Sequence, residues 1–106
     1  MPDSSPDTGK IYAGDRTIDG IVVTVNGEPL PDRTDVRAFT DLGFEWTYEG
    51  DSPRQLALAL LADFLGDDQR ALVLSEAFMS AVVANLDNTW EMSGQEVADA
   101  VAALES

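Results

Sequence analysis

The middle of the chain changes from an alternating to a continuous hydrophobic pattern within a few residues. Phe44, Trp46 and Tyr48 alternate with polar residues, and this period of two predicts a half-buried strand. The run from Leu56 to Leu65 is apolar at almost every position, which predicts a central helix buried on nearly all sides. We expect the rest of the chain to pack around this strand and helix.

Residues at both ends of the apolar run predict where the central helix begins and ends. Ser52 is expected to cap its N-terminus, and Pro53 fits the first helical position, where its missing amide hydrogen costs no hydrogen bond. Gly66 is expected to end the helix in a left-handed conformation.

Strand signals also precede this region. Residues 1–9 are polar and include two prolines, which predicts a disordered tail. The segments Lys10–Gly14 and Ile21–Val25 predict the two strands of a hairpin, with a turn over Asp15–Gly20.

The connection to the central strand begins with a turn signal. Asn26 and Gly27 predict a tight turn. Pro29 and Pro31 lack backbone amide donors, so the strand that follows is expected to be short and at the edge of the sheet. Residues 31–42 predict an irregular connection or a single helical turn.

Two further helices and a short strand are predicted after the central helix. Asp67 and Asp68 suit a helix start, and a strand is predicted around Trp90. Ser93 and Glu96 match a capping box at the start of the last helix. The apolar residues at helical spacing in these two helices are Ala71, Leu74, Phe78, Val82, Leu86, Val97, Val101 and Leu104.

These elements predict a single α+β domain over residues 10–106. Its architecture is expected to be a three- to four-stranded, mainly antiparallel sheet packed with three helices. A monomer is favoured over an oligomer.

The strongest compositional feature is the negative charge. The 106 residues contain 20 acidic and 6 basic side chains, for a net charge of −14, and Lys10 is the only lysine. Acidic surfaces with little lysine suit a cytoplasm at molar salt, where the Debye length falls to about 3 Å and charge repulsion is screened. The alternative is an acidic mimic of nucleic acid. Direct nucleic-acid binding is disfavoured because no basic patch is present.

The composition also limits the available chemistry. The chain contains neither cysteine nor histidine, so thiolate chemistry and imidazole bases are absent. No apolar run has the length of a membrane span and the N-terminus lacks a signal-peptide pattern, so a soluble, cytoplasmic protein without membrane contact is expected. No cofactor is predicted. Whether the protein is an enzyme stays open, and the absence of a catalytic motif favours a non-enzyme.

The candidate binding residues are at the predicted strand-to-helix junction. An aromatic floor with a carboxylate, a guanidinium and an amide can bind a small polar ligand or a peptide. The alternative is that the aromatic residues form the core face of the sheet, with Glu45 solvated or paired with Arg54. The candidates are Glu45, Trp46, Tyr48, Arg54 and Gln55.

A divalent-ion enzyme is a further alternative, based on the carboxylates of Asp63, Asp67 and Asp68. The spacing lacks the ligand pattern of an EF-hand loop, and helix capping explains the same residues. No metal site is therefore predicted.

The motif GFEW-x-Y-x-G-x-x-P-x-QLALALL, from Gly43 to Leu61, resembles the hallmark of a small family of uncharacterised domains found in bacteria, archaea and phages. Flanking similarity extends from about Lys10 to Val101. The resemblance implies a compact α+β domain, often encoded near mobile elements, with no implied activity. The composition resembles that of haloarchaeal proteins.

Together these observations favour a salt-adapted cytoplasmic module that binds a protein or a ligand. The partner is not identified by the sequence. The alternatives are a nucleic-acid mimic that inhibits a nucleic-acid-handling protein, and a divalent-ion-dependent enzyme.

Overall fold

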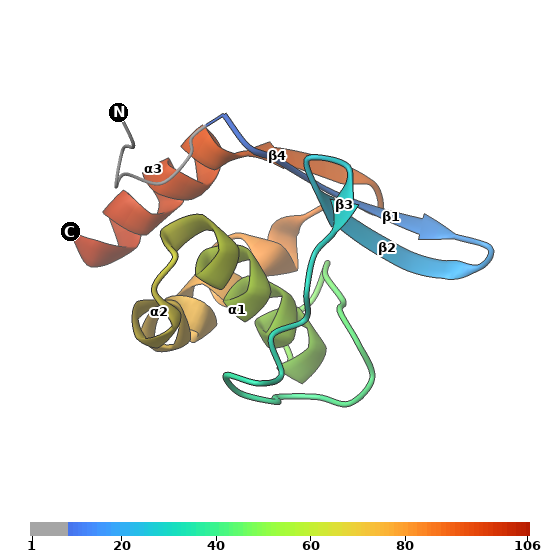
Figure 1. Ribbon diagram of the computed structural model, residues 1–106, viewed down its shortest axis with the longest axis horizontal. Helices are drawn as coiled ribbons and strands as arrows, with labels where there is room; N and C mark the ends of the chain where they lie inside the picture. Colours follow the sequence, from blue (N-terminus) through green and yellow to red (C-terminus); the bar gives the residue numbers. More distant parts are fainter. Residues whose placement is uncertain (1–8) are drawn as a thin grey trace.

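The computed structural model describes residues 9–106 and confirms the predicted α+β class (Figure 1). All of the predicted tail except Gly9 lies outside the described residues. One four-stranded antiparallel sheet packs with three α-helices. The elements are β1 (Ile11–Thr17), β2 (Gly20–Val25), β3 (Glu28–Pro29), α1 (Asp51–Leu65), α2 (Asp68–Ala81), the 3₁₀ helix η1 (Val83–Asn85), β4 (Trp90–Ser93) and α3 (Gly94–Glu105).

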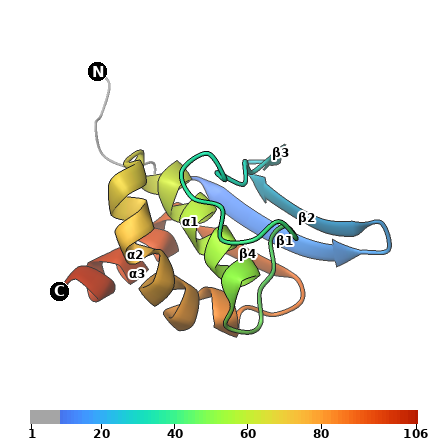
Figure 2. The same ribbon diagram turned by 90° about the horizontal axis from the view of Figure 1, so that it is seen from below.

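The sheet has the strand order β3-β2-β1-β4. The predicted hairpin is confirmed, but β1 continues to Thr17, so the turn is shorter than predicted. Asn26 and Gly27 both have positive φ, at 51° and 85°, as the predicted tight turn before β3 requires. The hairpin end of β1 and β2 extends beyond the helices in both views (Figures 1 and 2).

The predicted strand around Trp90 is β4, which pairs with β1. Gly14 lies directly opposite Trp90, and the indole packs against it. A Cβ atom at position 14 would lie 2.3 Å from Trp90 Nε1, so only glycine fits beneath this ring.

The central helix α1 is buried along almost its entire length, as predicted from its apolar sequence. The helix begins two residues earlier than expected, because Gly50 is the N-cap and Ser52 and Pro53 both lie inside the helix. Proline is tolerated there because amides of the first turn have no partner within the helix. Gly66 ends the helix with φ 65°, as predicted, and α2 then runs back along α1 (Figure 2).

The predicted strand over Phe44–Tyr48 is wrong. The segment is irregular, and Trp46 alone is completely buried, whereas Tyr48 is 49% exposed. Thr47 has φ 81°, which interrupts the extended pleat, and its amide donates to the carbonyl of Val83 rather than to a strand (3.2 Å). The alternation of aromatic residues therefore comes from a loop that inserts one indole into the core.

The two faces of the sheet have different environments. Tyr12, Val23 and Met92 are buried on the face that meets the helices, and the Tyr12 hydroxyl donates to Asp63 on α1 (2.7 Å). Because side chains alternate along each strand, the neighbouring residues point to the opposite face. Val22 is 49% exposed there, so the described helices leave this outer face of the sheet open.

Candidate functional site

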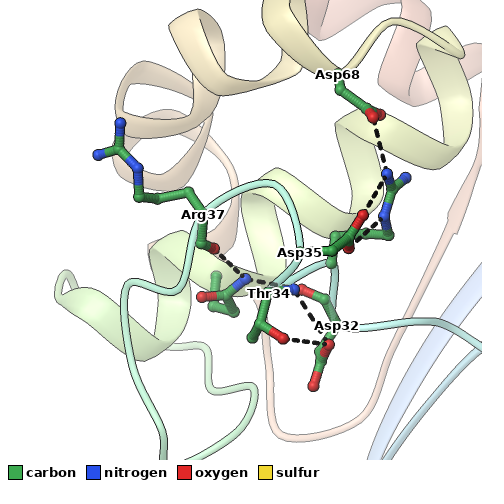
Figure 3. Close-up of polar contacts among 7 residues, drawn as sticks. Asp32, Thr34, Asp35, Arg37 and Asp68 are labelled. Carbon is green, nitrogen blue, oxygen red and sulfur yellow. Dashed lines mark hydrogen bonds and ion pairs between the residues drawn. The ribbon is translucent and has the colours of Figure 1, made fainter.

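Gln55 is buried on α1 and holds the loop that follows β3, which contains Asp32 and Arg37 (Figure 3). Its Nε2 group donates to the carbonyls of Asp32 (2.7 Å) and Arg37 (3.0 Å), and its Oε1 accepts from the amide of Phe39 (2.8 Å). Both amide protons and the carbonyl oxygen are therefore used within the fold, which gives this predicted binding residue a clear structural role.

Arg54, which precedes Gln55 on α1, also contacts the loop that follows β3. Its Nε donates to Ser75 Oγ on α2 (3.1 Å), and its guanidinium lies 4.2 Å from the centre of the Phe39 ring. Arg54 and Gln55 thus both hold Phe39 against α1, one through the ring and the other through the backbone. The pairing of Glu45 with Arg54, which was one form of the alternative interpretation, is not formed.

Glu45 pairs instead with Arg16 on β1. Arg16 Nη2 lies 2.6 Å from Glu45 Oε1 and 3.0 Å from the carbonyl oxygen of Trp46, while its guanidinium lies 4.5 Å from the centre of the Trp46 ring. Trp46 also meets Trp90 edge to face, with ring centres 5.8 Å apart. These contacts hold the β1–β2 hairpin against the loop that contains Glu45 and Trp46.

The five predicted binding residues therefore do not meet at one cleft. Glu45 and Trp46 support the hairpin, and Arg54 and Gln55 support the loop after β3. Tyr48 is the exposed aromatic residue among them.

The carboxylates of the divalent-ion alternative have separate partners. Asp63 pairs with Lys10 Nζ (3.1 Å), Asp67 caps α2 by accepting from the amide of Arg70, and Asp68 pairs with Arg33 (2.8 Å). Within residues 9–106, no group of three or more acidic side chains is arranged to hold a metal ion.

Three exposed ion pairs, two of them formed by Arg33 and one by Arg70, shift the pKa values of some of their members. Hydrogen bonds to Asp35 and then to Asp68 raise the pKa of Arg33, and the same guanidinium lowers the pKa of Asp35 (Figure 3). The hydrogen bond from Arg70 lowers the pKa of Glu105 in the same way. These pairs join the loop after β3 to α2, and α2 to the end of α3.

An open hollow lies on the outer face of the sheet, away from the five predicted binding residues. A hollow of about 480 Å³ crosses β2, β1 and β4, within the roughly 300–1,000 Å³ typical of ligand sites. The side chains that line it from this face are Ala13, Asp15, Val22, Thr24, Thr89 and Glu91. Thr89 Oγ1 donates to Asp15 (2.8 Å) at one end.

Sequence reasoning did not identify this hollow, although a signal was present. Val22 and Thr24 on β2 alternate with inward-facing residues, as do Ala13 and Asp15 on β1. The strand pairing that places these residues side by side was needed to recognise a common surface.

The fold and this geometry define a small α+β domain with an open sheet face, and no described helix has the length and apolar character needed to cross a bilayer. The chain matches the model of a family of unknown function, DUF6166, over residues 12–103, and it belongs to that family. The predicted resemblance to an uncharacterised family is therefore confirmed. No curated protein and no solved structure matches the chain.

Proposed function

We propose that this domain is a salt-adapted, cytoplasmic interaction module that binds a protein partner through the outer face of its sheet. The observation that carries this proposal is the open hollow across three strands, with Ile11 (40% exposed) and Val22 (49% exposed) on the same face. Aliphatic side chains on an uncovered sheet face contribute to association when a partner removes them from water.

The roles of the polar clusters support this choice of surface. The buried amide of Gln55 and the guanidiniums of Arg16 and Arg54 are engaged with other parts of the chain. Disrupting these contacts to bind a ligand would leave buried backbone groups unpaired, which costs about 1–3 kcal/mol for each group. Tyr48, with its exposed ring, stays a candidate for additional partner contact.

The distribution of acidic residues favours salt adaptation over nucleic-acid mimicry. A mimic needs its carboxylates in one stripe with phosphate-like spacing, whereas here they occur on β1, β3, β4, all three helices and the loops. Such a distribution suits general solubility at high salt.

Two matched substitutions test the proposed surface. Val22→Arg places a bulky cation on the outer sheet face, and Val73→Arg makes the same change on the exposed side of α2. Each tagged variant would be incubated with native cell extract at its own ionic strength, and a retained partner would be quantified against the wild type.

We expect Val22→Arg to lose the partner and Val73→Arg to keep it, with both variants retaining the circular dichroism of the wild type. Equal retention by the two variants would contradict the proposal.

A further inference from the structure

The geometry of the outer face indicates which kind of partner it accepts. We propose that the hollow binds an extended, basic segment of a partner protein, with a lysine or arginine stem over Ala13 and its charged head near Asp15 and Glu91. This inference rests on the proposed function and specifies the chemistry of the partner.

The strand register explains why a hollow forms at this position. Thr24, Ala13 and Glu91 lie side by side across β2, β1 and β4. Ala13, the smallest of the three, is in the middle, so the larger flanking side chains enclose a depression. In the next row Val22 lies opposite Asp15. The floor is thus aliphatic and the edges are polar.

The charges around the hollow are all negative. Asp15 and Glu91 are exposed lining residues, and neither takes part in an ion pair within residues 9–106. The nearest basic residues along β1, Lys10 and Arg16, alternate to the other face and pair with Asp63 and Glu45. Among residues 9–106, the residues that line the hollow therefore include no cation.

A basic side chain matches both features of the hollow. Lysine and arginine cover apolar surface with their methylene stems while the charged head remains in contact with water and carboxylates. A second copy of the chain, with a net charge of −14, and a nucleic acid would each bring negative charge to the same carboxylates. Charge complementarity therefore favours a basic protein segment.

The test uses three capped heptapeptides in which valine alternates with lysine, glutamine or glutamate. Binding would be followed by two-dimensional ¹H–¹⁵N NMR of the intact protein at several salt concentrations. The lysine peptide is expected to shift the amides of Ala13, Thr24 and Glu91, and to bind about tenfold more tightly than the glutamine peptide, because each exposed ion pair contributes up to about fivefold.

Two matched variants distinguish attraction of the lysine peptide to the carboxylates at the hollow from its attraction to the net negative charge of the protein. Glu91→Gln and Glu76→Gln change the net charge equally, but Glu76 lies on the exposed side of α2. We expect Glu91→Gln to lower the affinity for the lysine peptide about threefold and Glu76→Gln to have little effect on it. Equal effects of the two variants would overturn the inference.

The other outcomes distinguish this inference from the proposed function. Equal binding of the lysine and glutamine peptides to the sheet face would overturn the inference that the partner is basic. The same result would support the proposal that this face is a binding surface. Concentration-dependent shifts of the same amides without peptide would assign the face to a second copy. If no peptide shifts these amides, the inference is wrong, and the comparison of Val22→Arg with Val73→Arg then decides the proposed function alone.

Discussion

Gln55 provides the sharpest test of how this fold is held together. We expect Gln55→Leu to destabilise the domain by about 3 kcal/mol, because the similarly sized apolar side chain removes three hydrogen bonds at a position that is 1% exposed. Each lost bond contributes about 1 kcal/mol, with a larger cost where a backbone group remains buried. For a domain of this size the melting temperature should fall by roughly 12–24 °C.

The measurement is urea unfolding at high salt, followed by tryptophan fluorescence and circular dichroism. Gln69→Leu is the matched control, since Gln69 is exposed on α2 and its replacement should change stability by less than about 0.5 kcal/mol. Amide hydrogen exchange adds a local readout, because the Phe39 amide donates directly to Gln55. It should exchange faster in Gln55→Leu than in the wild type.

The structural role of Gln55 would be disproved if the stability of Gln55→Leu lay within about 0.5 kcal/mol of the wild type and the Phe39 amide kept its protection from exchange. Such a result would mean that the loop after β3 is held by other contacts, and it would return Gln55 to the set of candidate ligand-binding residues.

Two further perturbations follow from individual contacts, and a third follows from the net charge. Gly14→Ala should cost about 2 kcal/mol, because the new methyl group overlaps the Trp90 indole; thermal unfolding measures this loss. Glu105→Gln should lower stability slightly at neutral pH, and this difference should vanish on acidification, because the pairing with Arg70 lowers the pKa of Glu105 in the folded state and is lost as pH falls through that value. Below roughly 0.1 M salt, where the Debye length exceeds about 10 Å, the net charge of −14 should destabilise the domain, as circular dichroism would show.

Each of these expectations has a result that would contradict it. An unchanged melting temperature for Gly14→Ala would show that Trp90 can move without loss of packing. A Glu105→Gln effect that persists at low pH would exclude the ion pair as its cause. Circular dichroism unchanged down to millimolar salt would contradict salt adaptation.

Local signals predicted most elements of this fold because those elements depend on nearby residues. The capping box at Ser93 and Glu96, the left-handed Gly66 and the Asn26–Gly27 turn are each determined within a few residues, and all are present. The buried helix α1 was also predictable, since a continuous apolar run has no face that prefers water.

The candidate site was less predictable because it depends on contacts between distant segments. The alternation around Trp46 is the pattern of a strand, but the positive φ of Thr47 and the cation from Arg16, thirty positions away, hold it as a loop. The outer hollow likewise requires the pairing of β1 with β4, which are separated by most of the chain. Periodicity describes one segment and does not identify the strand beside it.

Photo-crosslinking can show whether the outer face of the sheet binds a protein partner. A benzophenone amino acid would be introduced at Val22 on that face or at Val73 on α2, and the protein irradiated in its native cells. We expect one saturable adduct from position 22 that maps to a lysine- or arginine-containing segment, and none from position 73. Adducts from position 73 alone, or of equal yield at both positions, would contradict the proposal.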